Sequence, residues 1–392
     1  MKNSTYSLSW VCAVLGASSP ISLALLAPAL PVIAKAISAT PKEVQISTAI
    51  YLYVFGVSQL FVYVIVYKFG EKISLKIGSV LYLLATLLIF VYNKIEILYV
   101  VRALQALATS IIVISSRAVI RKKIDKDFIS RAFFISGVTF SLSPILGPIL
   151  SAFATTNWGW YSPFFLQIFF GVIFLILSVS AVPSTEKVKF QTTVRSGLKF
   201  IFLDKYFLKY SFVASLAFAG IFSFTVLGPF IFEQDLHLPS YAYGYIAPLS
   251  AVGYLMISIM NLIMPGLIIF NKPFHFGIGF LLLSSLILLF FVFLAEATFL
   301  LEAFVFSAFL WNAGCALIFP PSFTKCLSKF HQDASKAVSV FGFLQFIISS
   351  IATSIVSLVV FKPIFTLSFA FTIITFLIVI IYFTNSQEEV HN

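Results

Sequence analysis

Uncharged apolar runs long enough to cross a lipid bilayer recur along the whole sequence, and they constrain its fold more than any other feature. Two clear examples are FGIGFLLLSSLILLFFVFL, residues 276–294, and FTLSFAFTIITFLIVIIYF, residues 365–383. A helix needs about 20 such residues to cross the hydrocarbon core, and within lipid the backbone must satisfy its own hydrogen bonds. We therefore expect an all-α polytopic membrane protein.

Polar residues are too few to cover a water-facing surface. Charged residues make up 10% of the 392 residues, against about 25% in soluble domains. The sequence has no Gly-rich phosphate loop, zinc-protease motif or nucleophile elbow, and its cysteines, Cys12, Cys315 and Cys326, lack metal-ligand spacing. These features argue against an enzyme, and we expect neither a cofactor nor a metal.

Charges, prolines and glycines divide the apolar sequence into twelve predicted spans. They are 9–36, 45–67, 75–93, 97–119, 129–153, 162–182, 209–232, 241–266, 274–294, 297–320, 336–361 and 363–384. The third, sixth, ninth and twelfth are the most uniformly apolar, which predicts helices that face lipid. The longest polar connection separates six spans from six, so we expect an N-terminal half at 1–183, a cytoplasmic linker at 184–208 and a C-terminal half at 209–392. The linker pattern fits an interfacial helix and a disordered segment equally well.

Lysine and arginine are distributed unevenly between the two predicted sides of the membrane. Of the 25 such residues, only Lys35, Lys42, Lys94 and Lys362 fall on one side, and Arg102 falls within a span. The excess on the other side predicts that both termini are cytoplasmic, because basic loops stay inside. It also explains a sequence pI near 9.4 without a nucleic-acid partner.

Arg102 is unusual because it lies within the predicted span 97–119. Helical spacing at about 100° per residue places four polar residues on one face: Arg102, Gln105, Thr109 and Ser116. Intramembrane charges commonly mark transport routes. Because Arg102 is also close to the outer end of its span, it could instead extend to the lipid headgroups. The sequence leaves both interpretations open.

Polar residues also lie on spans of the second half. We take Arg102, Gln105, Thr109, Asn312 and Gln345 as candidate residues of a transport cavity, with simple helix–helix contacts as the alternative. No Asp or Glu falls in the middle of a predicted span. Glu302, near the outer end of the tenth span, is the candidate for proton coupling, and an ordinary interfacial carboxylate is the alternative.

Four stretches resemble a known family of transporters. They are LLAPALPVIAKAI at 25–37, VVRALQALATS at 100–110, SLSPILGPIL at 141–150 and GCALIFPPSFTKCLSKFHQDASKAVSVFGFLQ at 314–345. Together they resemble the major facilitator superfamily, and within it the Bcr/CflA-like drug-resistance transporters. The resemblance implies two six-helix halves that rock about a midplane cavity. It also implies that Pro144, Gly147 and Pro148 bend and closely pack the fifth span.

The sequence departs from the family pattern at charged positions. In YVIVYKFGEK, residues 63–72, Lys68, Gly70 and Lys72 match the family's gating loop, but Glu71 stands at an Arg position. The family's first span also carries an acidic residue where this chain has Ala24. The resemblance therefore implies a gating loop with altered charges and a transport route without that acid.

These observations predict a monomeric alternating-access transporter in the bacterial inner membrane, with a small-molecule substrate and the lipid bilayer as its partners. The resemblance implies export of a small organic solute or drug by proton antiport. The missing intramembrane acids and the retained Arg102 keep an alternative open, namely a facilitator or exchanger of an anionic metabolite without proton coupling.

Overall fold

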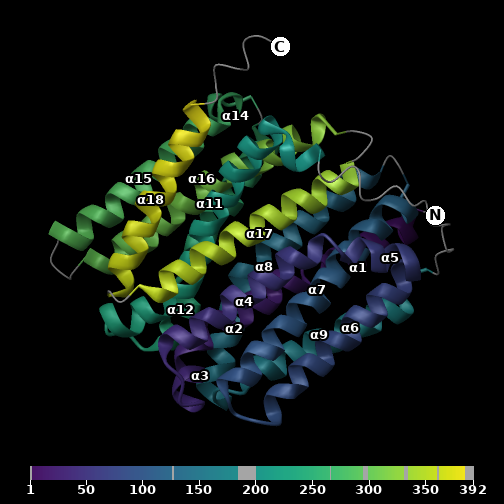
Figure 1. Ribbon diagram of the computed structural model, residues 1–392, viewed down its shortest axis with the longest axis horizontal. Coiled ribbons are helices and arrows are strands. Elements are labelled where there is room, and N and C mark those ends of the chain that lie inside the picture. The colour runs from purple at the N-terminus through teal and green to yellow at the C-terminus, as the bar shows by residue number, and fades with distance from the viewer. Residues whose placement is uncertain are drawn as a thin grey trace. The chain divides into compact units, whose positions relative to one another are not determined.

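A computed structural model describes residues 2–125, 128–183, 200–264, 266–294, 299–330, 334–359 and 362–384, and within these ranges every regular element is a helix (Figure 1). The chain divides into two compact units, Met1–Thr192 and Thr193–Asn392, called here the first and second halves. Most of the predicted linker lies outside the described residues. Its described end is helical at 200–203, and the next helix begins at Lys205.

The first half consists of helices that follow the six predicted spans. Its elements are α1 (Lys2–Gly16), α2 (Ser18–Leu26), the 3₁₀ turn η1 (Ala27–Ala29), α3 (Leu30–Ala36), α4 (Pro41–Gln59), α5 (Val62–Phe69), α6 (Glu71–Leu87), the 3₁₀ turn η2 (Leu88–Phe90), α7 (Ile95–Lys123), α8 (Ile129–Trp158) and α9 (Ser162–Ser180). The first span is thus a broken helix, and Pro28 lies in its 3₁₀ turn. Proline cannot donate a backbone hydrogen bond, which explains the change of helix type there.

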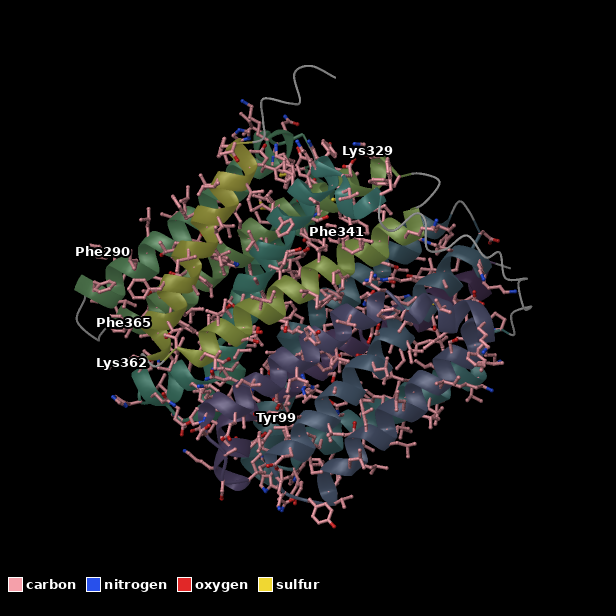
Figure 2. The ribbon with its side chains drawn as sticks, viewed as in Figure 1. Tyr99, Phe290, Lys329, Phe341, Lys362 and Phe365 are labelled. Atoms are coloured by element: carbon pink, nitrogen blue, oxygen red, sulfur yellow. The ribbon has the colours of Figure 1, made fainter. Side chains whose placement is uncertain are left out.

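The second half repeats this plan. Its elements are α11 (Lys205–Phe230), the π-helical turn η4 (Ile231–Asp235), α12 (Ser240–Ile246), α13 (Pro248–Ile263), α14 (Ile268–Asn271), α15 (Pro273–Leu294), α16 (Leu300–Ser328), α17 (Ala334–Leu358) and α18 (Pro363–Thr384). Figure 2 shows Lys329 and Lys362 at opposite ends of this half. That placement agrees with the charge count, which predicts them on opposite sides of the membrane.

The described residues contain eleven helical segments that are long and apolar enough to cross a membrane. The predicted span 45–67 is not among them, because its helix is interrupted between Gln59 at the end of α4 and Val62 at the start of α5. The all-helical membrane fold is confirmed. The count of twelve spans and the N-in, C-in orientation stay predictions.

Glycines allow close helix packing at equivalent crossings in the two halves. A Cβ atom at Gly78 of α6 would lie 3.0 Å from the carbonyl oxygen of Ala108 in α7. A Cβ atom at Gly314 of α16 would lie 2.8 Å from the carbonyl oxygen of Gly277 in α15. Small residues matter here because lipid supplies no hydrophobic driving force between helices, so association depends on close packing.

The uniformly apolar spans also bury hydroxyl groups on their inner sides. Ser79 of α6 and Ser178 of α9 are 3.2 Å apart at their oxygens. In the second half, Ser285 of α15 and Thr375 of α18 are 3.0 Å apart. The prediction that these helices face lipid therefore describes one side only, because their other side packs inside the half through matched polar contacts.

Candidate functional site

The predicted polar face of α7 is buried inside the first half. The side chains of Arg102, Gln105 and Thr109 are 0% exposed. The guanidinium of Arg102 therefore does not extend to the surface, and the headgroup interpretation does not fit the structure. Ser116, further along the same helix, is also buried but donates only to the carbonyl oxygen of Val113 in its own helix.

Arg102 uses few of its hydrogen-bond donors. Its Nη1 donates to Oε1 of Gln105 at 3.0 Å, and its central carbon lies 4.2 Å from the ring centre of Tyr51 in α4. Its Nε and Nη2 have no hydrogen-bond partner among the described residues. A guanidinium carries five N–H donors, so most of this one's hydrogen-bonding capacity is unused.

Gln105 connects Arg102 to three other helices. Its Nε2 donates at 2.9 Å both to Oγ1 of Thr86 in α6 and to Oε1 of Gln167 in α9. Gln167 in turn donates from Nε2 to the carbonyl oxygen of Ser22 in α2, at 3.0 Å. These bonds fix the Gln105 amide, since both its donors and its acceptor are engaged. The amide therefore holds Arg102 in one orientation.

Tyr51 holds the other side of the arginine. Its hydroxyl lies 2.7 Å from Oγ1 of Thr109 and donates to Ser19 in α2 at 3.2 Å. A cation over a tyrosine ring face is stabilised by the ring quadrupole, typically by about 0.5–2 kcal/mol. We call Arg102, Gln105, Thr109, Tyr51, Thr86 and Gln167 the Arg102 cluster.

The Arg102 cluster offers a positive charge without a negative partner. No ion pair to Arg102 occurs among the described residues, and its partners there are an amide and an aromatic ring. Burying an uncompensated charge costs several kcal/mol. An acceptor such as a carboxylate or phosphate could engage Nε and Nη2 together, because arginine binds such groups in a bidentate way. The cluster is therefore suited to bind an anion.

Within the described part of the second half, no hydrogen bond joins the predicted cavity residues into such a cluster. Asn312 donates from Nδ2 to the carbonyl oxygen of Ala308, one turn back in α16. The backbone carbonyl of Gln345 accepts from Ser349 within α17. Both side chains are largely buried. Their assignment to a transport cavity stays a prediction.

Glu302 lies apart from these polar residues. It is exposed in the first turn of α16, and its ten-residue separation from Asn312 corresponds to about 15 Å along a helix. Apolar side chains, including Leu249 and Phe306, line the surface hollow that it borders. Its coupling role also stays a prediction.

The predicted gating loop joins α5 to α6. Gly70 has φ +80°, a conformation that side-chain-bearing residues rarely adopt. Lys68 is exposed and Lys72 is half-buried. Glu71, at the position where the family has an arginine, is buried and pairs with Lys122 of α7 at 2.5 Å. The altered charge thus connects α6 to the end of α7.

The predicted bend residues lie within a single helix, because α8 continues through Pro144 and Pro148. Gly147 is buried, and a Cβ atom there would lie 2.5 Å from the Cβ atom of Ala24 in α2. Gly147 therefore permits a close approach of α8 to α2. The bending role of the two prolines stays a prediction.

The sequence reasoning missed Tyr51, Thr86 and Gln167. Thr86 and Gln167 were overlooked because they lie in the third and sixth spans, which were expected to face lipid. Gln167 was nevertheless visible as the one amide in the apolar run FFLQIFF, residues 164–170. An isolated amide in lipid is costly, so its position was a usable signal. Tyr51 gave no such signal, since tyrosines are enriched near membrane–water interfaces and Tyr51 lies close to the start of the predicted span 45–67.

Comparisons with known proteins agree with this architecture. The profile of the Major Facilitator Superfamily matches residues 12–353. A bicyclomycin resistance protein homolog of Haemophilus influenzae is 24% identical over 66% of this chain and 67% of its own length. The multidrug resistance protein MdtL of Vibrio parahaemolyticus is 24% identical over 83% and 82%. A crystal structure of a mutant nucleoside transporter NupG, 13% identical, matches with a TM-score of 0.72 over 96% of this chain and 98% of that one, which shows a shared fold.

Proposed function

Because the chain belongs to the Major Facilitator Superfamily, we propose that this secondary transporter exports a small organic solute across the bacterial inner membrane by alternating access, coupled to proton antiport. The drug-resistance names of its relatives support export. Bacterial relatives and the multi-pass helical fold support the inner membrane as its location.

The observation that carries the transport site of this proposal is the Arg102 cluster. Its guanidinium is wholly enclosed and has two nitrogens without partners among the described residues. Selection for stability alone would replace such a guanidinium with an apolar side chain, because buried unpaired charges destabilise the fold. We assign Arg102 as the cluster's contact to the cargo or to the group that it exchanges. Gln105, Thr109 and Tyr51 position it.

The experiment is an accumulation assay with cells that express the full chain, using a mixed panel of dyes and metabolites with and without an uncoupler. If the protein exports a solute by antiport, expressing cells should accumulate little of that solute. When the uncoupler is added, its accumulation should rise to the level of cells that carry the empty vector. If no solute of the panel accumulates differently in expressing cells and in cells with the empty vector, export is contradicted.

Arg102→Ala tests the site within the same assay. It removes the cation while leaving Gln167 and Thr86 in place, so we expect flux to fall by at least about 100-fold, as for other oriented charged contacts, with unchanged expression. Arg121→Ala is the matched control, because Arg121 is exposed in the last turn of the same helix. Normal flux in Arg102→Ala would exclude this site.

A second candidate function is exchange of an anionic metabolite without proton coupling. The same unpartnered nitrogens favour it, because a fixed cation without a nearby acid suits an anion better than a proton. Counterflow in proteoliposomes without a pH gradient separates the two functions. Counterflow of a carboxylate or phosphate ester that is unaffected by collapse of the gradient would support exchange and contradict the antiporter.

Glu302→Gln tests the predicted coupling residue. If Glu302 carries the proton, the variant should lose the dependence of flux on pH while retaining counterflow. An unchanged pH–rate profile would remove Glu302 from the mechanism.

A further inference from the structure

Lysines and aromatic rings gather at one end of the second half, away from its predicted cavity residues. Nζ of Lys325 in α16 donates to the hydroxyl of Tyr210 in α11 at 2.8 Å. The same ammonium lies 4.5 Å from the ring centre of Tyr210, 5.7 Å from that of Phe274 and 6.0 Å from that of Tyr206. Lys329, one turn later, lies 5.9 Å from the Tyr206 ring. We call these five residues the Lys325 cluster.

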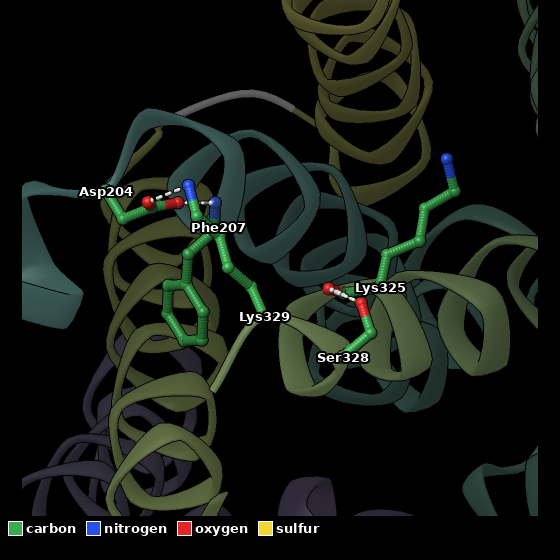
Figure 3. Close-up of polar contacts among 5 residues, drawn as sticks. All are labelled: Asp204, Phe207, Lys325, Ser328 and Lys329. Carbon is green, nitrogen blue, oxygen red and sulfur yellow. Dashed lines mark hydrogen bonds and ion pairs between the residues drawn. The ribbon is translucent and has the colours of Figure 1, made fainter. Parts of the chain in front are cut away.

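The nearby carboxylate is engaged elsewhere. Asp204 accepts from the backbone N–H of Phe207 at 2.7 Å, which caps α11, and it also pairs with Lys329. Figure 3 shows Lys325 extending away from this pair. Among the described residues, no ion pair to Lys325 occurs, and its partners are a neutral phenol and ring faces. No described carboxylate therefore neutralises its positive charge.

The charge at this end exceeds what helix dipoles explain. Four lysines and one carboxylate lie at the start of α11 and the end of α16: Lys205, Lys209, Lys325, Lys329 and Asp204. Cations near the C-terminus of a helix stabilise it, which accounts for the two lysines of α16. Of the two in α11, Lys205 stands in the first turn, where a positive charge is unfavourable. The excess of lysines over carboxylates among the described residues of this end favours an anionic ligand.

The surroundings of the Lys325 cluster indicate a membrane boundary. The positive-inside count predicts this end to be cytoplasmic, and tyrosines concentrate at headgroup depth. Large apolar side chains are exposed just before α11 and at the end of α18. Phe200 is 68% exposed and Leu203 67% exposed just before α11, and Phe383 is 48% exposed at the end of α18.

We propose that the Lys325 cluster binds the headgroup phosphate of an anionic phospholipid from the adjacent leaflet. Lys325 donates to the phosphate oxygens, and Tyr206 and Tyr210 frame the headgroup. Lys329, which is paired with Asp204, adds positive charge at the rim of the site. Basic pockets between helices at this boundary bind such headgroups. The exposed apolar side chains contact acyl chains, which a soluble phosphate lacks. The site therefore takes lipid in preference to free phosphate.

The test measures lipid retained by the purified full chain. The protein is equilibrated with mixed vesicles of phosphatidylcholine and phosphatidylglycerol, isolated in mild detergent, and the bound lipids are quantified by mass spectrometry. We expect enrichment of phosphatidylglycerol, and we expect Lys325→Gln to reduce that enrichment about fivefold, since a lysine that contacts the bound anionic headgroup contributes about 1 kcal/mol. High salt should reduce it as well, because it screens exposed charges.

Lys123→Gln is the matched control, because Lys123 is exposed at the end of α7 in the first half and carries the same charge. It should leave the enrichment unchanged. If Lys325→Gln is poorly folded, Lys329→Gln replaces it, since Lys329 is 51% exposed. Equal enrichment in wild type, the Lys325 or Lys329 variant and the control would overturn the proposal. Displacement of the lipid by glycerol phosphate at equal concentration would overturn the preference for lipid.

Discussion

Equivalent helices of the two halves bury opposite kinds of side chain. α7 and α16 each have 29 residues, and among the described residues they carry the two largest wholly buried side chains, Arg102 and Trp311. Trp311 donates from Nε1 to the carbonyl oxygen of Ala217 at 2.9 Å and stacks on Phe371, with ring centres 3.9 Å apart. Its single donor is satisfied, whereas two nitrogens of Arg102 have no hydrogen-bond partner in the described part of the chain.

The difference separates a packing role from a functional one. A satisfied, stacked tryptophan is what stability favours in a helix bundle. A buried guanidinium with unused donors lowers stability, so its presence needs another reason. We therefore propose structural support as the role of Trp311 and ligand contact as the role of Arg102, and the following variants test that proposal.

Trp311→Ala should have the largest effect on stability. Removing a wholly buried aromatic ring costs about 3–5 kcal/mol, so the thermal midpoint in detergent should fall markedly. Trp158→Ala is the control, because Trp158 is 68% exposed. A midpoint that falls equally in both variants would show that Trp311 has no special packing role.

Arg102→Met, unlike Trp311→Ala, should not lower the thermal midpoint. Replacing a buried charge with an apolar residue of similar length is commonly neutral or stabilising by about 1–4 kcal/mol. We expect an unchanged or raised thermal midpoint together with lost flux. A midpoint lowered as far as in Trp311→Ala would mean that Arg102 is structural, and the contrast between the halves would fail.

Gly220→Ala tests how tightly Trp311 is enclosed. A Cβ atom at Gly220 in α11 would lie 2.1 Å from a ring carbon of Trp311, and overpacking of this kind costs about 1–3 kcal/mol. Gly137→Ala in α8 is the matched control, since nothing lies within 4 Å of a Cβ atom there. The thermal midpoint should fall in the first variant and not in the second. Equal midpoints would indicate that Trp311 can move aside.

Gln167→Leu should have a modest effect on stability and a larger one on flux. It removes two hydrogen bonds, the one accepted from Gln105 Nε2 and the one donated to the carbonyl oxygen of Ser22, while the bond from Gln105 to Thr86 remains. Each lost hydrogen bond costs about 1 kcal/mol. Because Gln105 then orients Arg102 less firmly, the Michaelis constant for the cargo should rise. Ser178→Ala, on the same helix, is the control. Unchanged transport kinetics in Gln167→Leu would show that the amide network does not position Arg102.

Local sequence patterns predicted the elements well because span length and hydropathy reflect the thickness of the bilayer. Helix α7 extends beyond the predicted span 97–119 at both ends, and α16 extends beyond the predicted span 297–320 at its C-terminal end. Hydropathy marks the part of a helix that lies in lipid and not the end of the helix. The interruption between α4 and α5 had no such signal, because apolar residues continue through it.

The sequence by itself determined that this chain is a helical membrane protein, and it identified Arg102, Gln105 and Thr109 as one helical face. Those conclusions follow from composition and from the regular rotation of a helix. Only the tertiary structure decided that Tyr51, Thr86 and Gln167 complete the Arg102 cluster, because they come from three other helices. It also decided that Arg102 is enclosed, since burial depends on neighbouring helices that no local pattern specifies.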